Sequence, residues 1–125
     1  MPPRRIALRM RQATVTRADG AIVCARCWVA DRPWSRLRGL LGRSGLEAGE
    51  GLLLRPSGSI HMLFMRFPID AVFCDRDLVV LDVVPGLRPW RFAGRRGARV
   101  VIELAEGAAG DLAPGDRLAV ATIDP

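Results

Sequence analysis

Apolar and polar residues alternate along most of this chain, with a period of two that is typical of half-buried β-strands. The alternation predicts two strands, over residues 6–17 and 21–30. Between them, Ala18-Asp19-Gly20 supplies the Asp-Gly pair whose positive φ angles a tight hairpin needs. Further strands, separated by short turn-rich segments, are predicted near 51–55, 60–65, 69–75, 78–84, 99–105 and 117–123.

One segment, residues 31–42, has the period of an amphipathic helix instead. Asp31 is the expected N-cap, Pro33 fits the first turn, and Gly42 is the expected end of the helix. On a helical wheel, Arg38 falls at the rim of an apolar arc that we expect to pack on the sheet. The arc consists of Trp34, Leu37, Leu40 and Leu41.

Together these elements predict a mainly β fold, of the α+β type, with a single helix. Short strands at regular spacing favour an antiparallel sheet that curls into a small barrel or sandwich of about seven or eight strands, with the helix packed on it. Residues 107–112 add one helical turn at most. A chain of 125 residues is long enough to bury a core as one domain, residues 1–125, of which we expect 1–5 to be flexible.

A hairpin is predicted around Asp75-Arg76-Asp77-Leu78, and its register decides which face of the sheet carries Asp70. If Cys74 pairs with Val79, Asp70 points inward at the end of an apolar face. That face then consists of Asp70, Val72, Cys74, Val79, Leu81 and Val83.

The distribution of apolar residues also bears on location. Hydrophobic residues make up 50 % of the chain, yet no apolar run approaches the roughly 20 residues that span a bilayer. The basic N-terminal residues 1–9 are not followed by an apolar segment, which argues against a secretory signal. We therefore expect a cytoplasmic protein with no membrane partner.

The chain is strongly basic, with a formal net charge of +6, and all of its 19 basic residues are arginine. In the densest cluster, residues 88–99, five arginines interleave with two aromatic residues, an arrangement that can hold phosphates and stack on bases. Arginine without lysine, together with abundant Ala, Gly and Pro, is also what a GC-rich coding sequence produces whatever the function. We therefore expect weak, salt-sensitive and sequence-independent nucleic-acid binding at most. The candidate anion-binding residues are Arg88, Trp90, Arg91, Arg95, Arg96 and Arg99.

Cys24 and Cys27 have the spacing of a metal-binding or redox pair. Residues three apart in a strand face opposite sides, so we expect separate, buried and reduced thiols. A zinc site needs four convergent ligands, and only Cys74 and His61 remain to complete one. The sequence predicts no bound metal and no other cofactor.

A catalytic alternative rests on His61 and Asp70, which could act as a general-base pair with Ser57 or Ser59 as the nucleophile. A single histidine in an apolar strand is more often a hydrogen-bonded core residue. A hydrolase-like enzyme is therefore the second interpretation, after a binding function.

Three separated motifs stand out: Arg36-x-Arg38-Gly39-Leu40, the run from Ile60 to Asp70, and Glu103-Leu104-Ala105-Glu106-Gly107. Together they resemble the prokaryotic family known only as domain of unknown function 192 (DUF192), over residues 20–122. The resemblance implies a small, compact, mainly β domain without an established activity. It also implies glycine at the position of Leu78 and, in much of the family, tryptophan at that of His61.

Charged residues at these motif positions lie in apolar surroundings: Arg38, Arg66, Asp70 and Glu103. Two arginines and two carboxylates can form bidentate pairs. We expect either a buried ion-pair network, with Arg38 paired to Asp70 or Glu103, or a pocket for a small-molecule or peptide carboxylate. The chain is thus predicted to be a non-enzymatic binding or accessory domain with a partly apolar cleft. The candidate cleft residues are Arg38, His61, Met62, Arg66, Asp70 and Glu103.

Overall fold

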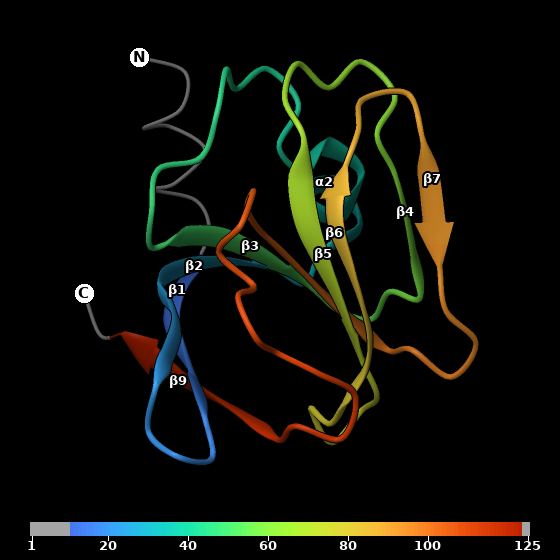
Figure 1. Ribbon diagram of the computed structural model, residues 1–125. Helices are drawn as coiled ribbons and strands as arrows, with labels where there is room; N and C mark the ends of the chain where they lie inside the picture. The colour runs from blue at the N-terminus through green and yellow to red at the C-terminus, as the bar shows by residue number, and fades with distance from the viewer. Residues whose placement is uncertain (1–10, 124–125) are drawn as a thin grey trace.

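The computed structural model describes residues 11–123 and shows a mainly β protein with one short helix, as predicted (Figure 1). The helix is α2 (Pro33–Arg38). The strands are β1 (Arg11–Arg17), β2 (Ile22–Ala30), β3 (Glu50–Leu54), β4 (Ser59–His61), β5 (Ile69–Cys74), β6 (Val80–Leu87), β7 (Phe92–Gly94), β8 (Val100–Ala105) and β9 (Leu118–Ile123). The predicted start of the first strand at residues 6–10 and the flexibility expected of residues 1–5 lie outside the described residues.

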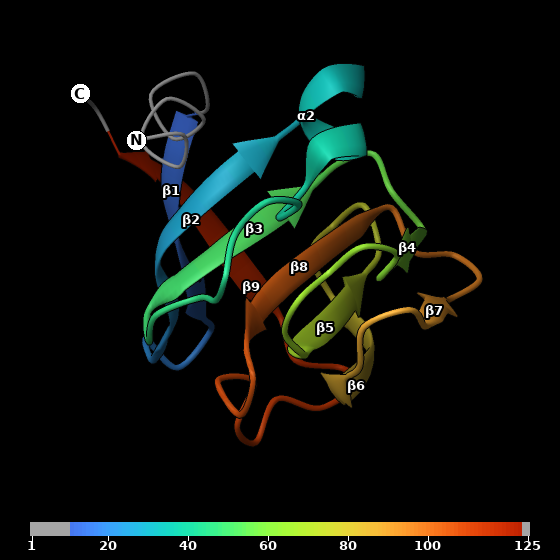
Figure 2. The same cartoon turned by 90° about the horizontal axis from the view of Figure 1, so that it is seen from above.

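Seven strands form one sheet in the order β6-β5-β8-β3-β2-β1-β9, and β4 pairs with β7 in a second sheet. Strands β2 and β3 run parallel, which the alternation did not predict. Parallel neighbours need a crossover connection, and here the segment that contains α2 provides it. The large sheet is strongly curled (Figure 2), and a single β-bridge joins Val79 to Arg117. Within residues 11–123, however, the edge strands β6 and β9 do not pair with each other, so the sheet does not close into a barrel.

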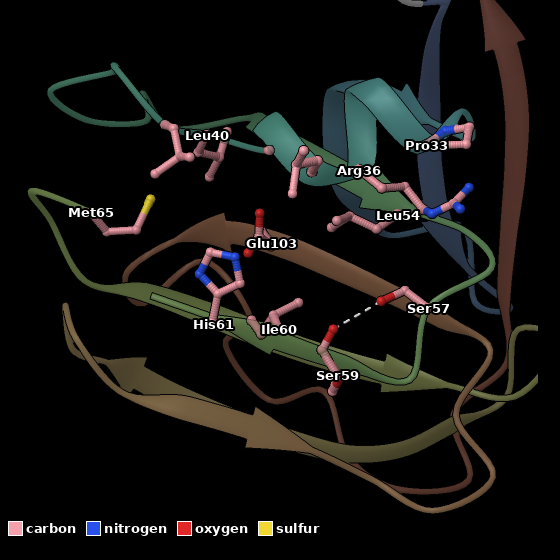
Figure 3. Close-up of a pocket in the computed structure, with 13 residues that line it drawn as sticks. Pro33, Arg36, Leu40, Leu54, Ser57, Ser59, Ile60, His61, Met65 and Glu103 are labelled. Carbon is pink, nitrogen blue, oxygen red and sulfur yellow. Dashed lines mark hydrogen bonds between the residues drawn. The ribbon is translucent and has the colours of Figure 1, made fainter. Parts of the chain in front are cut away.

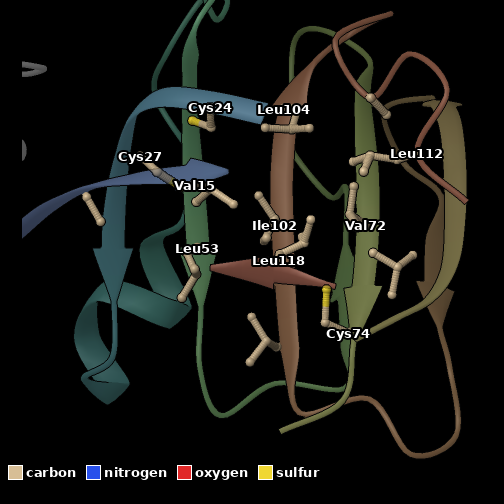
Figure 4. Close-up of a cluster of buried hydrophobic side chains, with 14 of the residues drawn as sticks. Val15, Cys24, Cys27, Leu53, Val72, Cys74, Ile102, Leu104, Leu112 and Leu118 are labelled. Atoms are coloured by element: carbon tan, nitrogen blue, oxygen red, sulfur yellow. The ribbon is translucent and has the colours of Figure 1, made fainter. Parts of the chain in front are cut away.

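The curled sheet has an apolar core on each face. The first core lies inside the curl and takes residues from both edge strands as well as the central ones (Figure 4). The second core lies on the other face, beneath α2 and the β4–β7 pair, and includes Leu40, Leu52, Met62, Phe73 and Val101. Strands β3, β5 and β8 are therefore covered on both faces.

A β-bulge decides how the two neighbouring cysteines point. Ala13 pairs with Cys27 and Val15 with Cys24, so that three residues of β1 face four of β2. Both thiols therefore enter the first core, and the expectation that they face opposite sides is wrong. A hydrogen bond with the Cys24 thiol, and then burial, raises the pKa of Cys27. Within residues 11–123, no three side chains that could bind a metal ion lie together. The three cysteines form no disulfide bond.

The β5–β6 hairpin keeps Asp70 inside but differs in register from the prediction. Cys74 pairs with Val80 rather than with Val79. Irregularities at two places in the pairing cause the shift, and Leu81 turns to the second core instead of the first. Asp70 still points inward, as predicted, and is 1 % exposed.

Leu78, in the turn of this hairpin, has a φ of 65°, which is the left-handed conformation. Glycine adopts this conformation without strain, which agrees with the glycine that the family resemblance implies at this position. Its side chain packs on the first core. We expect Leu78→Gly to change stability little, because relief of the backbone strain offsets the lost contacts. Leu78→Val should cost roughly 2 kcal/mol, because a β-branched side chain fits this conformation poorly. Urea unfolding of both variants tests this, and a valine variant more stable than the glycine variant would contradict it.

Helix α2 is shorter than predicted. Its N-cap is Arg32 and not Asp31 as predicted. The helix ends at Gly39, whose φ of 51° stops it before the expected end at Gly42. Six residues are too few to lay the whole apolar arc on the sheet, so only the following Leu40 is buried, while Trp34 is 82 % and Leu37 66 % exposed. In residues 11–123 we find no helix of the length and hydrophobicity that would cross a bilayer.

The 88–99 segment, in which no strand is predicted from the sequence, contains strand β7. Its register places Gly94 opposite Ser59 of β4. A Cβ atom at Gly94 would lie 3.2 Å from the Cβ of Ser59, so glycine here permits a close approach of two strands rather than breaking a strand.

Candidate functional site

An open pocket of about 350 Å³ lies between α2, the end of β3, β4 and β8 (Figure 3). Most of its wall is apolar, from residues such as Leu37, Leu40, Leu54, Ile60 and Met65. The polar side chains of the wall are Arg36, Ser57, Ser59, His61 and Glu103. An apolar concave surface with few polar groups is the usual form of a small-molecule site.

Glu103 is the buried acid of this pocket. Strand β8 alternates, so that Ile102 and Leu104 enter the first core while Glu103 turns to the second face, beside Leu52 of β3. Glu103 is 5 % exposed, and burial raises the pKa of its carboxyl from 4.5 to about 8. None of the ion pairs among the described side chains reaches it. At neutral pH this carboxyl is therefore mostly protonated.

His61 comes from the end of β4 and lines the same pocket as Glu103 (Figure 3). Its Nδ1 accepts a hydrogen bond of 3.3 Å from the Leu63 backbone N–H. The Ser57 hydroxyl donates to the Ser59 carbonyl oxygen at 2.9 Å, so this predicted nucleophile is engaged with the backbone rather than with a base.

Asp70 lies on the opposite face of the sheet. It pairs with Leu104 in the ladder, one position from the Ala71–Glu103 pair, so that its side chain and that of Glu103 point to opposite sides. Its Oδ1 accepts from the Gly86 N–H at 2.9 Å, and its Oδ2 accepts from the N–H groups of Gly107 and Ala109 at 2.9 and 3.0 Å. The predicted His61–Asp70 pair is therefore not formed.

The structure divides the predicted cleft residues further. Met62 is wholly buried in the second core, and Arg66 is exposed outside the pocket. The Arg38 side chain, and with it the predicted pair to Asp70 or Glu103, lies outside what the structure describes. Of the predicted residues whose side chains the structure describes, only His61 and Glu103 line one cavity.

Two groups of residues were missed from the sequence. Arg36 and Leu40 line the pocket, and their place in the first motif was the signal that could have found them. Phe64 lies 4.9 Å, between ring centroids, from Trp90 of the predicted anion-binding loop. No local pattern could have revealed this contact, because it joins two loops. The loop residues Arg88, Trp90, Arg91, Arg95, Arg96 and Arg99 are all exposed, as an anion-binding loop requires.

Comparisons with known proteins agree with this fold. The DUF192 family model, described as "Uncharacterized ACR", matches residues 14–120. A "UPF0127 protein" of Thermococcus sibiricus is 33% identical over 98 residues, which cover 74% of this chain and 63% of that protein. The chain thus spans less than two thirds of the length of this relative.

Two solved structures have similar folds. One, from Sinorhizobium meliloti and described as "a putative transcription regulator", has a TM-score of 0.76 at 22% identity, over 88% of this chain and 92% of that one. The other, a protein of unknown function from Novosphingobium aromaticivorans, has a TM-score of 0.74 at 24% identity, over 86% of this chain and 83% of that one. At these identities the likeness concerns the fold alone.

Proposed function

We propose, for a chain that belongs to the DUF192 family of uncharacterised proteins, a binding function at the pocket between α2, β4 and β8. The ligand is a small molecule with an apolar body and one amino group, and Glu103 is its polar anchor. The role is that of a non-enzymatic binding or accessory protein. A cytoplasmic location suits its three unpaired cysteines.

The observation that carries this proposal is the convergence of the three motifs on one cavity. The first motif contributes Arg36, Gly39 and Leu40 to the wall, the second Ile60, His61 and Met65, and the third Glu103. These segments are far apart along the chain, and the topology brings them together beside the second core. A purely structural role for the motifs would not need a shared open pocket.

The chemistry of the wall favours an amine. The apolar residues can bury an aliphatic body, and Leu37, which is exposed, extends the apolar wall into solvent. Among the described residues, Glu103 has no ionic partner, so a cationic group of the ligand would pair with its carboxylate. Because Glu103 is buried, this pair would lie in a medium of low dielectric constant, where electrostatic attraction is strong. The amine would displace the carboxyl proton when it binds.

Hexylamine, hexanol and hexanoate are matched probes for this proposal, and nuclear magnetic resonance titration measures their binding. We expect hexylamine to bind best. Its affinity should rise about tenfold per pH unit up to the Glu103 pKa of about 8 and then level off, because binding requires the ionised carboxyl. Glu103→Gln should abolish that pH dependence, whereas Glu47→Gln, at an exposed site, should not. Preferential binding of hexanoate would contradict the proposal.

A hydrolase remains the alternative, on His61 and Glu103 rather than on His61 and Asp70. The observation in its favour is that an imidazole and an acid of raised pKa share one pocket. We favour binding because the hydroxyl of Ser57 is engaged with a backbone carbonyl.

A further inference from the structure

Exposed aromatic and basic side chains gather where two connections run side by side, the one from β4 to β5 and the one from β6 to β7. We call them the aromatic–arginine patch: Phe64, Arg66, Arg88, Trp90, Arg91 and Phe92. Its three rings are 57–70 % exposed, and its three arginines are exposed as well. Large aromatic residues in solvent on adjacent segments mark an interaction surface.

Backbone hydrogen bonds hold the two connections together. The Trp90 N–H donates to the Met62 carbonyl at 2.7 Å, and the Met62 N–H donates to the Arg91 carbonyl at 2.8 Å. Next to them, strand β7 runs beside β4 (Figure 1), and Phe92 pairs with His61 in their ladder. The patch is therefore fixed by the backbone rather than carried on a free loop.

Two of the rings stand on strained backbone. Phe64 has a φ of 63° and Trp90 a φ of 70°, backbone conformations that are sterically unfavourable for residues other than glycine. The two rings contact each other at an interplanar angle of 60°. Burial does not explain this strain, because both side chains are exposed. The strain instead fixes the direction in which the rings are presented.

The charge of the patch selects an anionic partner. Residues 58–69 and 83–99 contain no Asp or Glu, and none of the ion pairs among the described side chains involves Arg66, Arg88 or Arg91. An arginine lies within two residues of each ring along the chain. This spacing matches a polyanion whose charges alternate with flat apolar groups.

We propose that the aromatic–arginine patch binds single-stranded nucleic acid, with bases stacked on its rings and phosphates held by its arginines. Such binding does not depend on the pocket function. Bases inside a duplex are stacked on each other and cannot lie on protein rings, so the partner is single-stranded. A lipid surface fits less well, because the guanidinium groups lie among the rings and would have to enter the apolar layer with them.

The test is fluorescence anisotropy of a labelled, mixed-sequence single-stranded DNA in low salt. We expect Phe92→Ala and Trp90→Ala each to weaken binding roughly tenfold, the loss of one stacked base. Trp34→Ala is the control, since Trp34 is also exposed, at 82 % against 57 % for Trp90, but lies on α2, and this variant should bind like the parent protein. Arg88→Gln with Arg91→Gln should reduce the slope of log affinity against log salt by roughly 1.4, about 0.7 for each lost phosphate contact, whereas Arg76→Gln should leave it unchanged.

Three results would overturn this inference. The first is equal binding by the parent protein and Phe92→Ala, which is exposed and has no core contact to lose. The second is binding of duplex DNA as tight as that of the single strand. The third is no binding to the single strand at all, whether or not the protein sediments with vesicles of phosphatidylcholine and phosphatidylglycerol. Thermal melting of each variant identifies any that fails to fold.

Discussion

Asp70→Asn should lower the free energy of unfolding by roughly 3 kcal/mol. The Asp70 carboxylate is buried and accepts three backbone N–H groups, one on Oδ1 and two on Oδ2. An asparagine has only one acceptor oxygen, and its NH₂ group would face at least one of these donors. That N–H would lose its partner, and the charge-assisted bonds would become neutral ones.

The Asp70 bonds also tie distant segments together. Gly86 lies in β6, whereas Gly107 and Ala109 belong to the turns after β8, which supply Ala109 and Leu112 to the first core. Urea unfolding of Asp70→Asn, compared with Asp77→Asn in an exposed turn, measures the effect. A silent Asp70→Asn would show that these bonds contribute little to the fold.

Glu103→Gln should act in the opposite direction and stabilise the protein by roughly 3 kcal/mol at pH 7. Burial raises the pKa of Glu103 from 4.5 to about 8 in the folded state. Below the unfolded pKa both states are protonated, and the folded state carries no penalty. As the pH rises from 4.5 towards 8, only the unfolded state releases its proton, so the parent protein loses stability until the folded pKa is passed. Glutamine cannot ionise and avoids this loss.

The gain from Glu103→Gln should therefore be small at pH 5, grow by up to about 1.4 kcal/mol per pH unit, and level off above pH 8. Urea unfolding at several pH values measures it, and Glu47→Gln, at an exposed position, supplies the control. A Glu103→Gln variant that is less stable than the parent at every pH would show that Glu103 is ionised and paired in the folded protein.

Local pattern was enough for most elements of the fold. Alternation placed the strands, and Asp19-Gly20 placed the first hairpin, because both depend on neighbours in the sequence. The predictions for the side-chain directions of Cys24 and Cys27 and for the pairing partner of Cys74 were wrong. Both depend on a β-bulge, whose position is decided by the partner strand and not by the local sequence. Local pattern also did not show that Asp70 and Glu103, predicted to share one cleft, lie on opposite faces of the sheet, because this depends on the pairing of β5 with β8.

The helix shows a second limit. The periodicity of residues 31–42 identifies an apolar face, but it does not tell whether another element covers that face. Leu40 is covered, whereas Trp34 and Leu37 are not. The glutamates show the same limit in electrostatics: Glu50 lies 3.1 Å from Arg43, and Glu103 has no such described partner, although both sit in apolar strands.

The strand order has a consequence for synthesis on the ribosome. Strand β8 inserts between β3 and β5, yet it is made after both of them. Until residue 105 has left the exit tunnel, β3 and β5 each have an unpaired and largely apolar edge, the kind of edge that joins other chains. Folding must therefore wait for the last quarter of the chain, and a nascent or truncated form that ends before β8 is the form most exposed to aggregation.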